Sequence, residues 1–222
     1  MAFEIKNGVL IEYIAEDGET SVIIPDNVTS IGRYAFDECK NLTEVKIPDS
    51  VTSIGASAFS DCKNLGKVIF SKTVESLGVN AFNRCNIYEI TLTENLKTFD
   101  PFYHSTLKKN EFKVFFTGNV EQWAKSGLST LLDRTYSLYI ENEPVKDVDL
   151  SNLTEIPSNA FYNGASLENV VFSDKTTSIG EKAFYKCESL KSINFGDSLV
   201  TIGDKAFYTI KQPCAVFLRC GF

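Results

Sequence analysis

Apolar residues return at fixed intervals along most of this chain. The clearest marker is a phenylalanine that follows an alanine and recurs every 23 residues in two groups of three: Phe36, Phe59, Phe82, Phe161, Phe184 and Phe207. In most units an Ile or Leu stands five residues before this phenylalanine, and Leu, Val or Ile follow at constant offsets, as Ile31, Leu42, Val45 and Ile47 do in the first unit. Such self-similarity is the mark of a repeat protein.

Each unit predicts a strand followed by a return of the chain. The segment "LTEVKI" (42–47) alternates apolar and polar residues, which is typical of a strand with one buried face. The next segment, "PDSVTSIG", contains a proline that cannot continue a ladder and a glycine suited to a tight turn, and "ASAFSDC" predicts a short helical or irregular return. Because one unit cannot bury its own apolar residues, we expect a right-handed coil whose strands form a parallel sheet, with about 4.8 Å per unit.

The repeated phrase also carries a family resemblance. The stretch "VTSIGRYAFDECKNLTEVKIPDSVTSIGASAF", which begins at Val28, resembles the BspA-like leucine-rich repeat, and the similarity extends over about residues 20–99 and 145–218. This resemblance implies an α/β repeat fold: a strand-rich, right-handed leucine-rich-repeat solenoid with a curved parallel β-sheet and with short helices or turns on the other face. It also implies a role mainly in adhesion and protein binding, in a family found widely in host-associated bacteria and in some protists.

We predict that residues 1–222 form a single solenoid of this kind. It is divided into an N-terminal capping hairpin around Asn7-Gly8, a first repeat array, an irregular island, and a second array with the C-terminal end: residues 1–21, 22–99, 100–147 and 148–222.

The island is the part of the chain where the period fails. Its sequence predicts a strand in "EFKVFF", a short amphipathic helix that carries the only tryptophan, Trp123, and two strands around an Asn-Glu-Pro turn in "YSLYIENEPVKDVDL". Two interpretations are open: the island is a structural adaptor, or it is a loop that presents Trp123, Tyr103 or His104 to a partner.

The cysteines follow the repeat. Cys39, Cys62 and Cys85 are 23 residues apart, and Cys187 has the equivalent position in its own unit. We therefore expect a column of free, buried structural thiols rather than disulfides or a metal site. Cys214 and Cys220 lie outside this column, and the sequence does not assign them a role.

Charge and hydropathy exclude some classes of partner. The formal net charge is −7, and the sequence has no run of basic residues that could bind along the phosphate backbone of a nucleic acid. We therefore expect no nucleic acid partner. We also expect no membrane insertion, because no apolar run reaches the roughly 18 to 20 residues that a membrane helix needs. The N-terminus "MAFEIKNGVLIEY" does not resemble a signal peptide. The chain therefore reads as cytoplasmic, or as extracellular and on the cell surface if a leader has been removed.

The sequence offers little for catalysis. His104 is the only histidine, and the recurring Ser-Ile-Gly lacks the G-x-S-x-G pattern of a nucleophile elbow. Asp26 and Asp49 recur because a turn after proline favours aspartate, although a ladder of such carboxylates could alternatively bind a cation. We expect that the protein is not an enzyme, that it has no catalytic or metal-binding residues and that it binds no cofactor.

The offsets of the buried residues also predict which side chains face solvent on the sheet. These are Lys46, Ile69, Thr91, Val171 and Asn194, preceded by the outward Glu44, Lys67, Glu89, Asn169 and Ser192. We predict a non-enzymatic scaffold that binds a protein or peptide through the sheet face, the island, or both. The candidate partner-binding residues are Lys46, Ile69, Thr91, Val171, Asn194, Tyr103 and Trp123. The alternatives are a secreted or cell-surface adhesin for host matrix protein or glycan, and a structural spacer; the oligomeric state does not follow from the sequence.

Overall fold

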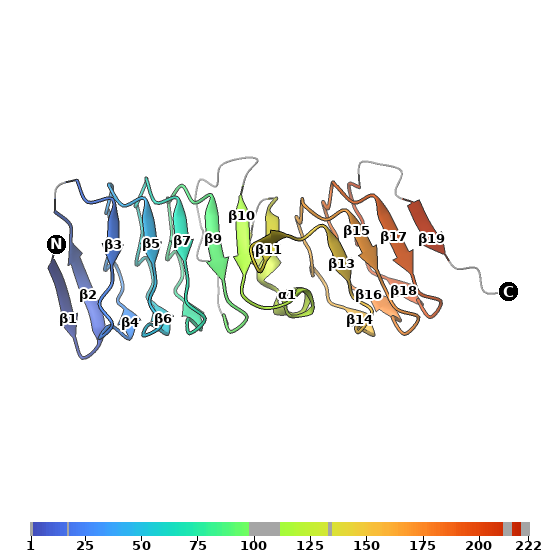
Figure 1. Ribbon diagram of the computed structural model, residues 1–222, viewed down its shortest axis with the longest axis horizontal. Helices are drawn as coiled ribbons and strands as arrows, with labels where there is room; N and C mark the ends of the chain where they lie inside the picture. Colours follow the sequence, from blue (N-terminus) through green and yellow to red (C-terminus); the bar gives the residue numbers. More distant parts are fainter. Residues whose placement is uncertain (1, 17, 98–111, 133–134, 211–214, 219–222) are drawn as a thin grey trace. The chain divides into compact units, whose positions relative to one another are not determined.

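Stacked strands divide between two units of the chain, residues 1–117 and 118–222 (Figure 1). The computed structural model describes residues 2–16, 18–97, 112–132, 135–210 and 215–218. The predictions made for Tyr103, His104, Cys214 and Cys220 lie outside these residues. Both units are strand-rich solenoids, as the repeat predicted.

The first unit consists of two ladders of strands. One ladder is parallel and has the order β3, β5, β7, β9, β10. The other has β2, β4, β6 and β8 in parallel, with β1 antiparallel to β2 at its end. The strands are β1 (Ala2–Lys6), β2 (Val9–Ile14), β3 (Ser21–Ile23), β4 (Ser30–Ile31), β5 (Glu44–Lys46), β6 (Ser53–Ile54), β7 (Lys67–Ile69), β8 (Ser76–Leu77), β9 (Glu89–Leu92) and β10 (Lys113–Phe116).

The second unit repeats this plan after a short helical segment. Its two parallel ladders have the orders β13, β15, β17, β19 and β14, β16, β18. The elements are α1 (Val120–Ser126), the 3-10 helix η1 (Leu128–Leu131), β11 (Ser137–Ile140), β12 (Glu143–Pro144), β13 (Asp147–Asp149), β14 (Glu155–Ile156), β15 (Asn169–Val171), β16 (Ser178–Ile179), β17 (Ser192–Phe195), β18 (Thr201–Ile202) and β19 (Ala215–Leu218). Among the described residues, no helix is long and apolar enough to span a membrane.

The phenylalanines that mark the repeat form the centre of each core. In the first unit Phe59 stacks on Phe36 and on Phe82, with ring centroids 4.6 Å and 5.2 Å apart. In the second, the rings of Phe161 and Phe184 are 5.4 Å apart. All five side chains are buried. The period of 23 residues therefore places each phenylalanine against the equivalent phenylalanine of the next repeat, and each repeat buries the apolar face of its neighbour.

The cysteines form free thiols along the same column. Cys62, Cys85 and Cys187 are buried and Cys39 is half-buried, and none of these four forms a disulfide. The Cys62 thiol donates to the carbonyl oxygen of Phe36 at 3.0 Å, and Cys187 makes the equivalent bond to Phe161 at 3.2 Å. Burial raises the pKa of the Cys187 thiol, so it stays protonated and unreactive. The prediction of structural thiols is confirmed for these positions.

The return segment is irregular, which is one of the two forms that the sequence predicted, and it is not a short helix. It contains a two-residue strand, such as β4 or β6, and then a series of turns. In each 23-residue repeat, the residue two positions before the marker phenylalanine and the residue two positions after it adopt positive φ. These are Tyr34, Glu38, Ser57, Asp61, Asn80, Arg84, Asn159, Asn163, Lys182, Lys186, Lys205 and Thr209. This left-handed conformation breaks any helix, and it costs residues other than glycine about 1–2 kcal/mol each.

Relief of this strain should stabilise the protein. Lys205 is exposed at φ +53°, and its only ion pair among the described residues is a 3.7 Å contact with Asp204. We expect Lys205→Gly to raise the free energy of unfolding by about 0.5–1 kcal/mol and Lys205→Val to lower it, because a β-branched residue tolerates positive φ worst. Urea denaturation of the two variants measures both changes; the same sign for both would contradict the explanation.

Two hairpins complete the fold. Asn7 and Gly8, at φ +52° and +77°, connect β1 to β2, as the Asn-Gly pair predicted. In the island, the turn between β11 and β12 is formed by Glu141 and Asn142, whereas the sequence suggested an Asn-Glu-Pro turn. Pro144 belongs to β12, and the strand that follows, β13, pairs with β15 instead of closing the hairpin.

Candidate protein-binding site

In the first unit, the parallel register aligns the outward side chains of the sheet in two rows. The mixed row is Ile23, Lys46, Ile69, Thr91 and Phe115. The charged row is Ser21, Glu44, Lys67, Glu89 and Lys113. Neighbouring strands in such a ladder are about 4.8 Å apart, so each row is a line of closely spaced side chains.

The mixed row exposes more apolar surface than the sequence suggested. Ile23 is 81% exposed, which is unusual for an isoleucine in a strand. Lys46 is exposed beside it, and Ile69 is half-buried on the other side of Lys46. Thr91 lies in the same row, as predicted. Sequence reasoning missed Ile23 and Phe115, although the repeat offsets of Val22 and Ile24 could have identified Ile23.

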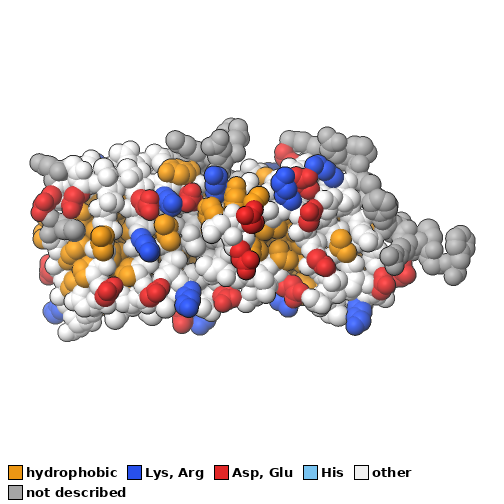
Figure 2. Space-filling view, in the orientation of Figure 1, with side chains coloured by type: hydrophobic (Ala, Val, Ile, Leu, Met, Phe, Trp, Pro, Cys, Tyr) orange, Lys and Arg blue, Asp and Glu red, His pale blue; other side chains and the backbone are white. Residues whose placement is uncertain are grey.

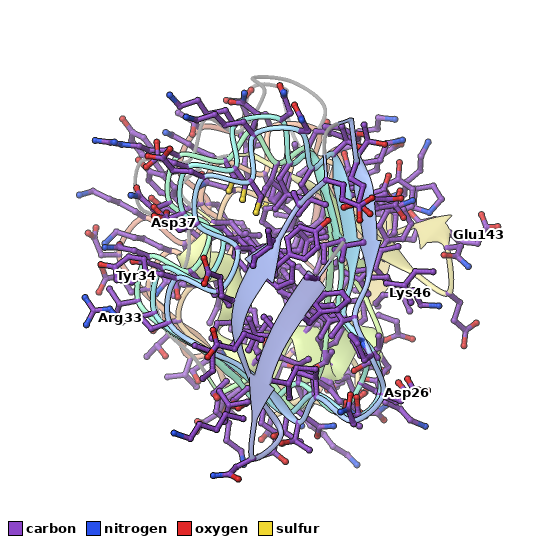
Figure 3. All side chains as sticks on the ribbon, turned by 90° about the vertical axis from the view of Figure 1, so that its left-hand side faces the viewer. Asp26, Arg33, Tyr34, Asp37, Lys46 and Glu143 are labelled. Carbon is purple, nitrogen blue, oxygen red and sulfur yellow. The ribbon has the colours of Figure 1, made fainter. Side chains whose placement is uncertain are left out.

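A groove of about 640 Å³ follows the ends of β3, β5 and β7. Its lining includes side chains of the mixed row and of the turns that follow the strands: Ile23, Asp26, Lys46, Asp49, Ile69 and Ser71. Figure 3 shows Lys46 and Asp26 on one side of the solenoid and Arg33 and Tyr34 on the opposite side. Lys46 forms no ion pair with another described residue, so its ammonium group is available to a ligand.

The charged row alternates in sign from β5 to β10. Figure 2 shows this alternation of acidic and basic side chains over the sheet face. Lys67 Nζ and Glu89 Oε1 are 3.0 Å apart, and the hydrogen bond to Glu89 raises the pKa of Lys67. Opposite charges on adjacent strands stabilise the sheet by roughly 0.2–1 kcal/mol per pair. The row therefore has no uniform charge that could attract a highly charged polymer.

The second unit presents a less apolar face. Val171, 40% exposed, lies in one row between Asp149 and the half-buried Asn194. The preceding row contains Asp147, Asn169 and Ser192, and the Asn169 amide donates to Asp147 at 2.5 Å. The predicted residues Val171 and Asn194 are thus brought together, but as a mostly polar surface.

The prediction that Trp123 is presented to a partner is wrong. Trp123 is fully buried, and its ring contacts Tyr136 edge to face, with centroids 5.5 Å apart. The helix that carries it begins with a capping box, in which the side chains of Asn119 and Gln122 each accept a hydrogen bond from the backbone of the other residue. The indole anchors α1 to the core of the second unit, in agreement with the adaptor interpretation.

Acidic side chains of the described residues lie at the groove but do not form a metal-binding cluster. No group of three or more His, Cys, Asp or Glu side chains among the described residues could hold a metal ion. Asp26 and Asp49 lie at the rim of the groove, where their carboxylates can pair with cationic side chains of a ligand. The arrangement of one exposed and one half-buried isoleucine, one free lysine and flanking carboxylates suits recognition of a polypeptide.

Comparison with known proteins agrees with this fold. A family model for the BspA type leucine rich repeat region matches residues 16–124 and 147–217, in 6 copies. Among solved structures, a leucine-rich repeat protein of T. pallidum is 20% identical, with 92% of this chain and 82% of that chain covered and a TM-score of 0.40. One from Bacteroides capillosus is 34% identical over 52% of this chain and 93% of that chain, with a TM-score of 0.43.

A leucine rich cell surface protein of Faecalibacterium prausnitzii is 20% identical, with 92% of this chain and 82% of that chain covered and a TM-score of 0.34. No curated protein matches the chain. The family model covers well over half of the sequence, in the two segments that contain the repeats. The chain therefore belongs to the BspA-type leucine-rich repeat family.

Proposed function

We propose that this protein is a non-enzymatic scaffold that binds a polypeptide in the groove along β3, β5 and β7. The observation that carries the proposal is the 81% exposure of Ile23 at the edge of that groove. Leaving an isoleucine in water forgoes about 1.5–3 kcal/mol of burial free energy, which a partner can recover. Exposed apolar side chains within a polar rim are the usual composition of a protein-binding surface.

The chemistry of the groove specifies the partner. Ile23 and Ile69 offer two apolar contacts about 10 Å apart, since each ladder step is about 4.8 Å. Lys46, between them, favours an acidic side chain, and Asp26 and Asp49 at the rim favour basic ones. We expect a segment with two aliphatic or aromatic residues separated by an acidic residue, with a basic residue at one side.

Selection from a random peptide library displayed on phage tests this directly. Peptides enriched on the intact protein are synthesised, and their affinity is measured by calorimetry for the wild type and for Ile23→Asp. We expect the dissociation constant to rise about tenfold or more, because an exposed apolar contact at the edge of the groove is replaced by a charge that repels the acidic residue.

A matched control separates binding from folding. Val200 in the second unit is 80% exposed, and it lies outside the groove, so Val200→Asp makes the same kind of change at an equally exposed site. We expect this variant to bind the selected peptides as the wild type does. Equal binding by Ile23→Asp, or an equal loss with Val200→Asp, would contradict the groove as the binding site.

A further inference from the structure

The charges on the sheet face of the first unit are arranged symmetrically about the line between β7 and β9. On one side of this line the charged row has Glu44 and Lys67, and on the other side it has Glu89 and Lys113. On one side of the line the nearer residue is the cation Lys67 and the farther one is the anion Glu44. On the other side the nearer residue is the anion Glu89 and the farther one is the cation Lys113. The face is therefore its own electrostatic complement when rotated by half a turn.

The geometry of that rotation is specific. A two-fold axis parallel to the strands, lying between two facing sheets and passing between β7 and β9, places β7 opposite β9 of a second copy and β5 opposite β10. Because the axis is parallel to the strands, each row faces the same row of the other copy. Lys67 then opposes Glu89 of the second copy, and Glu44 opposes its Lys113.

A second row has the same symmetry. The turns that follow β7 and β9 each carry an exposed charge three residues after the aligned pair Ile69 and Thr91, Lys72 in one and Glu94 in the other. These two turns are adjacent, since the Asn95 side chain donates to the carbonyl oxygen of Lys72 at 3.0 Å. The same two-fold axis therefore opposes Lys72 to Glu94 of the second copy.

The mixed row adds apolar contact without a conflict of charge. Under this rotation, Ile69 faces Thr91 of the second copy, and Lys46 faces the aromatic ring of Phe115. A lysine over an aromatic ring is attracted to its face. Across the four strands β5 to β10, the rotation brings no two like charges together.

We propose that a second copy of this chain docks on this face and forms an isologous dimer. In such an interface one surface patch serves both partners, which is the commonest symmetry of soluble oligomers. The Lys67–Glu89 pair of each copy, 3.0 Å apart within the chain, meets its counterpart at the axis as a cluster of four alternating charges. This self-association goes beyond the peptide groove and competes with it, because Lys46 and Ile69 belong both to the groove and to the four strands that pair.

Salt is expected to weaken the dimer. In the single chain 31% of the Lys67 side chain and 21% of the Glu89 side chain are exposed, and salt screens the attraction of such partly exposed charges for an approaching copy. Sedimentation equilibrium of the full chain, as a function of protein concentration, measures the association. We expect the dissociation constant to rise about tenfold or more between about 50 mM and about 500 mM sodium chloride.

Reversal of the whole charged row is the decisive variant. The combination Glu44→Lys, Lys67→Glu, Glu89→Lys and Lys113→Glu keeps every pair of opposite neighbours within the chain and keeps the face self-complementary. In a mixed dimer with the wild type, each position would face a like charge. We expect each protein to dimerise with itself and energy transfer between differently labelled wild-type and reversed chains to stay at background.

Other results would overturn the dimer. Free mixing of the wild-type and reversed chains would show that the row does not set the pairing, and a wild type that stays monomeric at every concentration would exclude self-association. If the reversed protein fails to fold, as judged by circular dichroism, Lys67→Glu alone replaces it and should abolish the dimer. A chain that stays monomeric but binds the selected peptides contradicts the dimer alone, whereas a chain that dimerises but binds none of them even when it is diluted to the monomer contradicts the groove alone.

Discussion

Replacement of Phe59 by alanine should lower the free energy of unfolding by about 3–5 kcal/mol, which is the usual cost of deleting a buried aromatic ring. Phe59 is completely buried, and it is the middle ring of three in the first unit. Its removal leaves a cavity and ends the contacts with both Phe36 and Phe82. Because each repeat in a solenoid is stabilised only by its neighbours, no distant part of the unit can compensate.

Urea denaturation followed by circular dichroism measures this effect, and Tyr34→Ala is the control. Tyr34 belongs to the same unit and loses a ring of similar size, but it is 47% exposed. Its main contact is with Arg33, whose guanidinium lies 4.7 Å from the ring centroid and donates to the hydroxyl at 3.0 Å. We expect this variant to lose about 1 kcal/mol or less. Similar losses for the two variants would contradict the role of the phenylalanine column as the core.

The core could be predicted from the sequence because its physical requirement is periodic. A residue that is buried between two neighbouring turns meets the same environment in every turn, so the same residue recurs, as the column of Phe36, Phe59 and Phe82 does. The buried cysteines follow the same logic, since Cys62 and Cys85 donate to equivalent carbonyl oxygens one repeat away. Wherever the period holds, the sequence specified strand register to the residue.

The return segments were harder to predict because their structure depends on the backbone alone. Strands of two residues, such as Ser30–Ile31, are too short to show an alternation of apolar and polar positions. The left-handed residues are occupied by Tyr34, Ser57 and Lys182 as well as by asparagine, so the composition gives little sign of positive φ. The sequence therefore did not predict the ladder of two-residue strands, which is β4, β6 and β8 in the first unit and β14, β16 and β18 in the second.

The candidate site was predicted in part for the same reasons. The offsets correctly aligned Lys46, Ile69 and Thr91 in one row, because register follows from the period. They could not give the 81% exposure of Ile23, which depends on which neighbours surround it. Trp123 lies where the period fails, and its burial depends on a contact with Tyr136, which no local pattern indicates.

The glycine that ends "SIG", or its equivalents "SLG" and "TIG", has a different role from the one that its place in a turn suggests. Gly55, Gly78, Gly180 and Gly203 do not have positive φ. Instead, each lies against the backbone of the preceding turn: a Cβ atom on Gly78 would be 2.3 Å from the amide nitrogen of Ala56 and 2.5 Å from the carbonyl carbon of Gly55. Glycine is required here because two main chains approach too closely for any side chain.

Gly78→Ala should therefore lower the free energy of unfolding by about 3 kcal/mol or more, toward the upper end of overpacking costs, since the added methyl group meets backbone that cannot rotate away. Gly18→Ala is the matched control in the same unit. Gly18 has φ +86°, and a methyl group added there would have nothing within 4 Å, so alanine suffers only the conformational cost of about 1–2 kcal/mol. Urea denaturation ranks the two variants: a smaller loss for Gly78→Ala than for Gly18→Ala would mean that backbone conformation, and not the approach of adjacent turns, requires the repeated glycine.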